Sequence, residues 1–248
     1  MSTAIPPLLA AESLKIQRGE GKDTKLILNG SPDCSFAIKS GNFYYLTGAS
    51  GVGKSTLLWA LARLHPLVTG VLRLNNQLQT EIAVARWRAE IALLPQKPVI
   101  MSGTVADNLL YPLHTFRIQK ERLNERHESL PNIEELQTEL ESVGLHDIPF
   151  EREATSLSGG QQARLALIRL LLTKPQLILA DEPTAGVDEA AADLVFNRLD
   201  RFCEQGGAII LTSHVYKERV SDARIVLDGN AGLAFKAKLC ESTDKAAL

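Results

Sequence analysis

The residues best suited to chemistry begin with a glycine-rich loop that ends in a lysine and two hydroxyl residues. Residues 48–56 read Gly-Ala-Ser-Gly-Val-Gly-Lys-Ser-Thr and match the phosphate-binding pattern G-x-x-x-x-G-K-[ST]. The glycines let backbone N–H groups turn inward around an anion, and a following helix adds its positive N-terminal end. The lysine is expected to reach the β- and γ-phosphates, and the serine to coordinate Mg²⁺. The residues predicted to bind the nucleotide here are Gly48, Ser50, Gly51, Gly53, Lys54, Ser55 and Thr56.

Two carboxylates follow a continuous apolar run later in the chain. The run 177–180 is typical of a buried parallel strand, and Asp181 and Glu182 come directly after it. Ligands of open α/β sheets sit at the carboxyl ends of such strands. Asp181 is therefore predicted to hold Mg²⁺ through water, and Glu182 to polarise an attacking water as general base. Taken alone, the pattern also describes a strand followed by an acidic turn.

A second glycine-rich piece runs from Leu157 to Gln161. Gly159 and Gly160 have no side chains, so the backbone there can approach a ligand closely. At a helix start their N–H groups would point toward an anion, and Ser158 adds a hydroxyl donor. This piece predicts a second anion site made of Ser158, Gly159, Gly160 and Gln161. The plainer alternative is a helix start marked by glycines.

An alternation of strands and helices is expected to hold these residues in place. Asn132, with Glu135 three residues later, is predicted to cap a helix that stops at Gly144. Such alternation predicts an α/β core with a helical insert. Strands are expected over 13–17, 25–28, 35–39, 42–47, 91–94, 177–180, 208–212 and 224–228. A strand pair is expected over 70–78, and a hairpin closes after 228. Helices are expected over 54–64, 160–173 and much of 107–152.

The composition excludes several classes of protein. The 248 residues are 45% hydrophobic and 23% charged, which is ordinary for a globular chain, and the net charge of −2 predicts no nucleic-acid binding. Cys34, Cys203 and Cys240 lie far apart and indicate neither a metal site nor a disulfide framework. No apolar run reaches the roughly 18 residues of a spanning helix, so a partner would have to cross any membrane.

With both glycine-rich pieces present, the sequence resembles the ATP-binding cassette (ABC) family over about residues 12–235. The resemblance implies that Ser158-Gly-Gly contacts the γ-phosphate of ATP held by another copy, in a head-to-tail homodimer closed by ATP. It also implies a Q-loop glutamine at Gln96 near the metal, a switch histidine at His214, and a D-loop aspartate at Asp188. Each of these three, taken alone, is more often an ordinary polar loop residue.

The fold implied is that of a P-loop NTPase of the ABC cassette type, in the α/β class. It has a RecA-like core, an N-terminal antiparallel β subdomain and an inserted helical subdomain. We expect one ATPase domain over 1–248, with the β-rich part at 10–45, the helical subdomain at about 98–156, and the core at 43–95 and 157–236.

This sequence departs from the family pattern at two points. An aromatic residue before the phosphate loop usually stacks on adenine, but the segment 14–19 contains none. Arg18 is a candidate replacement through its planar guanidinium. The D-loop reads Ala185-Gly-Val-Asp188 rather than the more usual Ser-Ala-Leu-Asp, although its aspartate is present.

The function predicted is an ATPase subunit that uses ATP and Mg²⁺ to power a separate transmembrane permease from the cytoplasmic face of the inner membrane. The stretch 94–109 resembles exporter-type cassettes, and FetA-type iron-export cassettes are the most similar, with lipoprotein-releasing and peptide-export ATPases as neighbours. The main alternative is a soluble cassette ATPase outside transport, as in iron–sulfur cluster assembly. A phosphoryl-transfer kinase is disfavoured because such kinases lack Leu157–Gln161.

Overall fold

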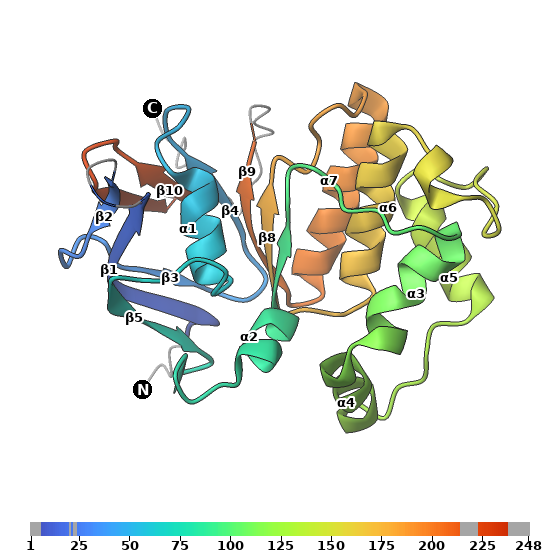
Figure 1. Ribbon diagram of the computed structural model, residues 1–248, viewed down its shortest axis with the longest axis horizontal. Helices are drawn as coiled ribbons and strands as arrows, with labels where there is room; N and C mark the ends of the chain where they lie inside the picture. Colours follow the sequence, from blue (N-terminus) through green and yellow to red (C-terminus); the bar gives the residue numbers. More distant parts are fainter. Residues whose placement is uncertain (1–5, 20, 22–23, 214–222, 238–248) are drawn as a thin grey trace, which may run out of the picture.

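Two sheets and the helices around them make up the part of the chain that the computed structural model describes, residues 6–19, 21, 24–213 and 223–237. Figure 1 shows an antiparallel sheet at one side of a mostly parallel sheet, with a group of helices at the other side. This arrangement confirms the predicted α/β fold, with its antiparallel β part and its inserted helices.

The antiparallel sheet has the strand order β2-β1-β5-β6, and β3 also pairs with β1. The predicted strand pair over 70–78 is confirmed as β5 and β6. Asn75 and Asn76 join the two strands with φ angles of 48° and 67°, the left-handed conformations that a two-residue hairpin turn requires. The strands are β1 Leu9–Arg18, β2 Lys25–Asn29, β3 Phe36–Ile38, β5 Thr69–Leu74 and β6 Gln77–Leu78.

The second sheet has the order β11-β10-β4-β9-β8-β7. All its neighbouring pairs are parallel except β10 and β11, which form the predicted closing hairpin. Every residue of β8 and β9 is buried, which explains their continuous apolar sequences. The strands are β4 Phe43–Thr47, β7 Ile91–Leu94, β8 Leu177–Asp181, β9 Ala208–Thr212, β10 Ala223–Leu227 and β11 Leu233–Ala237.

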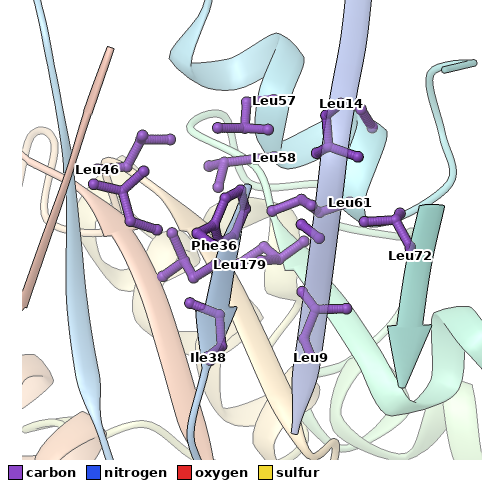
Figure 2. Close-up of a cluster of buried hydrophobic side chains, with 14 of the residues drawn as sticks. Leu9, Leu14, Phe36, Ile38, Leu46, Leu57, Leu58, Leu61, Leu72 and Leu179 are labelled. Carbon is purple, nitrogen blue, oxygen red and sulfur yellow. The ribbon is translucent and has the colours of Figure 1, made fainter. Parts of the chain in front are cut away.

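Helix α1, Lys54–Leu61, packs between the two sheets. Figure 2 shows its leucines at 57, 58 and 61 facing side chains of both sheets, among them Leu14 and Leu179. The opposite face carries the half-exposed Trp59. The helix ends three residues before the predicted Leu64, because Arg63 adopts a φ of 57° and donates to the carbonyls of Gln79 and Ile82.

Helices α6 and α7 cover the other face of the parallel sheet, and α3 and α5 pack against these two helices around a second apolar core. Asn132 caps α5 as predicted: its side chain accepts from the N–H of Glu135, whose carboxylate accepts from the N–H of Asn132. Gly144 then follows with a φ of 69°. The helices after α1 are α2 Val84–Glu90, α3 Val105–Thr115, α4 Arg117–Glu125, α5 Ile133–Ser142, α6 Gly159–Leu171 and α7 Glu189–Glu204.

Two helices were not predicted from the sequence. Helix α2 is only seven residues long, too short for a clear periodic signal. Helix α7 did carry a signal, because Val195, Phe196 and Leu199 recur at helical spacing and are buried. The antiparallel sheet takes β5 and β6 from within the segment 43–95 that was assigned to the core. The subdomain bounds given above stay a prediction.

A buried ion pair ties α4 to the edge of the core. The guanidinium of Arg122 lies 3.0 Å from the carboxylate of Glu90 at the end of α2, and both side chains are almost fully buried. Arg122 also donates to the carbonyls of Thr173 and Lys174, and Glu90 accepts from Gln176. Burial lowers the pKa of Arg122, and the charge of Glu90 opposes that shift.

We predict that Glu90→Gln lowers the free energy of unfolding by about 3 kcal/mol, because it leaves the buried guanidinium of Arg122 without its counter-charge. Urea unfolding measures this. The matched control is Glu121→Gln, which removes the exposed ion pair with Arg117 and should cost at most about 0.5 kcal/mol. Equal losses in the two variants would contradict the role assigned to the buried pair.

Candidate active site

The candidate residues meet at one edge of the parallel sheet, where β4, β9, β8 and β7 end. The glycine loop leaves β4, Asp181 and Glu182 close β8, and Gln96 follows β7. Thr212 ends β9, the strand between β4 and β8. The predicted placement of both carboxylates at the carboxyl end of a buried parallel strand is confirmed. His214 lies outside the described residues.

The glycine loop folds as a tight cradle at the start of α1. Gly48 has a φ of 148°, and a Cβ there would stand 2.7 Å from the carbonyl oxygen of Leu227. Gly53 has a φ of 118°, and a Cβ there would meet the side chain of Ile27 at 2.6 Å. Neither position has space for a side chain, and both use backbone conformations that favour glycine. The strand before the loop and the helix after it are the context that a phosphate-binding loop needs.

Two ammonium groups lie against this loop. Lys54 Nζ donates to the carbonyls of Gly48 and Ala49, at 2.9 and 3.1 Å. Lys25 Nζ, from β2, donates to the carbonyl of Gly51 at 2.7 Å. The loop therefore has two positive charges beside its glycine-rich backbone, which suits a polyphosphate. Lys25 was not predicted, because only the folding of β2 over the loop brings it there.

Asp181 and Glu182 are held by Thr212. The Thr212 hydroxyl donates to Asp181 Oδ1 at 2.6 Å and accepts from the backbone N–H of Glu182 at 3.0 Å. The same N–H lies 3.1 Å from the carbonyl of Thr212. Glu182 has a φ of 51°, a costly conformation for a residue with a side chain. The hydrogen bonds to Thr212 stabilise this turn, and the turn sets the direction in which the side chain of Glu182 points.

The side chains of Gln96 and Glu182 meet beside this turn. Gln96 Nε2 donates to Glu182 Oε2 at 2.8 Å. These two residues are far apart in the sequence, but β7 and β8 are neighbours in the sheet, so their carboxyl ends lie side by side. An amide and a carboxylate in contact at this edge can together position and polarise a water molecule.

The predicted Mg²⁺ residues fit a magnesium ion bound together with nucleotide phosphates. Ser55, Gln96 and Asp181 line one hollow of about 380 Å³, which brings a hydroxyl, an amide and a buried carboxylate together. No group of three or more His, Cys, Asp or Glu side chains able to hold a metal occurs in the described part of the chain. Mg²⁺ usually takes one or two carboxylates and completes its shell with phosphate oxygens and water, which matches this set.

The second glycine-rich piece starts α6, as predicted. The Ser158 hydroxyl accepts from the N–H of Gln161, whose side chain accepts from the N–H of Ser158. A Cβ at Gly160 would stand 3.2 Å from the carbonyl oxygen of Gly186. This helix start lines a hollow of about 500 Å³ with Gln96 and Asp188; among the described residues, none of 48–56 lines it.

Asp188 lies on the same hollow and caps α7. Its carboxylate accepts from the N–H of Ala191 at 2.9 Å. Burial lowers the pKa of the nearby Arg164 guanidinium, and the charge of Asp188 opposes that shift. Arg164 donates to the carbonyls of Val143 and Gly144, so it joins the end of α5 to the start of α6. Gln96 lines both this hollow and the hollow beside Ser55, which Thr56 and Asp181 also line. The predicted residues from Gly48 to Lys54, together with Gln161 and Glu182, line neither hollow.

Curated proteins of several kinds resemble this chain. LolD 2 of Rhodospirillum rubrum, a lipoprotein-releasing system ATP-binding protein, is 34% identical over 215 residues, which cover 84% of this chain and 87% of LolD 2. FetA of Escherichia coli K12, a probable iron export ATP-binding protein, is 30% identical over 228 residues, 91% of this chain and 93% of FetA. PhnC of Trichormus variabilis, a phosphonates import ATP-binding protein, is 33% identical over 214 residues, 84% of each chain.

These three relatives are named for different cargoes and for opposite directions, so similarity to FetA-type cassettes is not specific. The chain also matches the verA transporter of Clonostachys rogersoniana at 30% identity over 205 residues, 79% of this chain, and spans 15% of that protein.

Solved structures share the fold. A structure described as the ATP binding subunit of an ABC transporter superposes with a TM-score of 0.73 over 93% of this chain and 90% of its own, at 22% identity. A family model described as ABC transporter matches residues 32–185, which include both glycine-rich pieces and both carboxylates. The chain therefore belongs to the ABC transporter family, as its ATP-binding and ATP-hydrolysing component.

Proposed function

We propose that this chain hydrolyses Mg²⁺-bound ATP to drive a separate membrane permease, with Glu182 as the general base. The contact between Gln96 and Glu182 carries this proposal, because it places an amide and a carboxylate together at the edge where the phosphate loop ends. Asp181, held by Thr212, stands directly beside them.

Each group at this edge has a distinct task. Lys54 and the N–H groups of the glycine loop bind the β- and γ-phosphates, exchanging the present carbonyl contacts of Lys54 for phosphate oxygens. Gln96 orients the attacking water, and Glu182 accepts its proton as the water oxygen bonds to the γ-phosphorus. The bond from the γ-phosphorus to the β–γ bridging oxygen breaks, and ADP and inorganic phosphate are the products. Ser55, Gln96 and, through water, Asp181 would hold Mg²⁺, whose positive charge would offset the charge developing on the phosphate oxygens. His214 is proposed as a further contact to the γ-phosphate.

A second copy of the chain is proposed to complete the site. Ser158, Gly159 and Gly160 line a different hollow from the one beside Ser55 and Thr56. Their helix start therefore serves an anion other than the one in their own glycine loop. In a head-to-tail pair, this helix start contacts the γ-phosphate of ATP held by the partner, and Asp188 lies at the interface. The γ-phosphate then acts as the switch between open and closed pairs.

A groove of about 1,040 Å³ is proposed as the docking surface for the permease. Its two sides are formed by β7 and α2 and by the helices α3, α4 and α6, and exposed apolar side chains such as Val99 and Phe116 line it. Clustered exposed apolar residues mark interaction sites. None of the helices in the described residues combines the length and the apolar composition that a membrane span requires. The chain would act peripherally, at the cytoplasmic face of the inner membrane.

We propose export as the direction, with a metal ion such as iron as the cargo. The resemblance of residues 94–109 to exporter-type cassettes supports the direction. The similarity to FetA is compatible with iron, but LolD 2 and PhnC are slightly more similar. Copurification of the membrane partner from native membranes, followed by its sequencing, tests both assignments. If only soluble scaffold proteins copurify, a soluble ATPase of the iron–sulfur assembly type replaces the transport function.

We predict that Glu182→Gln lowers kcat for ATP hydrolysis by about a hundredfold or more, because the amide cannot accept the proton of the attacking water. The Kd for MgATP should stay within about twofold of the wild-type value, since the glycine loop is unchanged. Phosphate release and calorimetry measure the two quantities, and size-exclusion chromatography with ATP should show a stable dimer. Glu204→Gln, at the exposed end of α7, is the matched control and should leave kcat unchanged. Full turnover by Glu182→Gln would refute the assignment of the base.

We predict that Phe116→Asp weakens association with the permease about tenfold or more, because it puts a charge into an apolar groove. The ATPase rate of the isolated chain should not change. The matched control is Ile133→Asp, which is 72% exposed and lies outside the groove. Pull-down of the copurified membrane subunit measures how strongly each of the two variants associates with the permease. Equal retention of the permease by the two variants would show that it docks elsewhere.

A further inference from the structure

The hollow lined by Ser55 is also lined by two large side chains to which the proposed hydrolysis of ATP assigns no task. Besides Ser55, Gln96 and Asp181, it is lined by Arg18 from the end of β1 and Trp59 from α1. Thr56, from the first turn of α1, belongs to the same lining. At about 380 Å³, the hollow has the size of a small-molecule site.

The position of Trp59 follows from helical geometry. It lies three residues after Thr56 and four after Ser55, so all three share the side of α1 turned away from the buried leucines of Figure 2. Its side chain is 47% exposed. The other tryptophan, Trp87, is fully buried and donates from its ring N–H to the carbonyl of Leu61. A half-exposed indole in a hollow beside the phosphate loop offers a flat apolar surface to a ligand.

A hydrogen bond joins the end of β1 to the segment that follows α1. The ring of His65 contacts the carbonyl of Gln17 at 2.6 Å, and because a carbonyl only accepts, His65 Nε2–H is the donor. This bond holds the residue before Arg18 against the segment that follows α1. Within the described residues, the Arg18 guanidinium makes no hydrogen bond or ion pair.

Ser55 and Thr56, the residues that follow the glycine loop, line the hollow, so a nucleotide bound by that loop can extend its base into it. Thr56 is expected at the phosphates, and the hollow continues from it to Trp59 and Arg18. We propose that the base and ribose of ATP occupy this end of the hollow, with the base stacked on the Trp59 indole and the Arg18 guanidinium packed against it. This inference rests on the proposed binding of ATP by the glycine loop.

This arrangement has a consequence for selectivity. Stacking on an indole and a guanidinium uses the flat face of the base, which all bases share, and reads no hydrogen-bonding edge. His65, the remaining polar ring in the hollow, is already engaged with Gln17. The chain should therefore bind ATP and GTP with Kd values within about threefold of each other.

The test measures Kd values by calorimetry on the full chain for MgATP, MgGTP and inorganic triphosphate, which has no base. Trp59→Ala should raise the Kd of both nucleotides about tenfold, because the stacking of the base on the indole is lost. The Kd of inorganic triphosphate should stay within about twofold of the wild-type value, because the phosphate loop is unchanged. Trp59→Phe should retain most of the affinity, and it guards against a loss of folding. Val68→Ala, a half-exposed apolar residue outside the hollow, is the matched control and should leave all the Kd values unchanged.

Tryptophan fluorescence provides a second readout, since the chain has only two tryptophans. MgATP should change the emission of the wild-type chain but not that of Trp59→Phe, in which only the buried Trp87 emits. An ATP affinity unchanged in Trp59→Ala, or an equal loss for ATP and inorganic triphosphate, would overturn the base site. A wild-type chain that binds neither ligand would overturn the proposed function, and the base site with it.

Discussion

The parallel pairing of β4, β9, β8 and β7 is the constraint on which the rest of the structure depends. Because parallel strands end at the same edge, four distant segments of the chain deliver their polar residues to one place. The register opposes Asp181 and Thr212, so the threonine hydroxyl reaches the carboxylate and the N–H of Glu182. A shift of β9 by one residue would reverse its side chains and separate this pair.

The backbone at this edge is held in conformations that are costly in isolation. Gly48 and Gly53 adopt positive φ angles where neighbouring atoms leave no space for a side chain. Glu182 adopts one despite having a side chain, and the bonds to Thr212 hold it there. The buried leucines of α1 pack against both sheets and fix the helix that ends the glycine loop. The apolar core that contains these leucines therefore positions the polar site at the carboxyl edge of the parallel sheet.

Gln96 connects three regions of the molecule. It contacts Glu182, and it lines both the hollow beside Ser55 and the hollow beside Ser158. Three residues further on, Val99 lines the apolar groove. The short segment after β7 thus runs from the nucleotide edge, past the start of α6, to the proposed docking surface. A change in the contacts of Gln96 on hydrolysis would be transmitted along this segment by covalent continuity.

Local sequence patterns predict the glycine loop, the carboxylates after β8, the cap of α5 and the glycine-marked start of α6, because each depends on residues within a few positions of one another. The same patterns extend α1 beyond its observed end at Leu61, and the prediction lacks α7 although Val195, Phe196 and Leu199 form a buried helical stripe. The tertiary fold alone brings Thr212 to Asp181, Lys25 to the glycine loop, and Arg18 and Trp59 to one hollow. These neighbours come from different strands and helices, and strand pairing and burial bring them together, which no local pattern encodes.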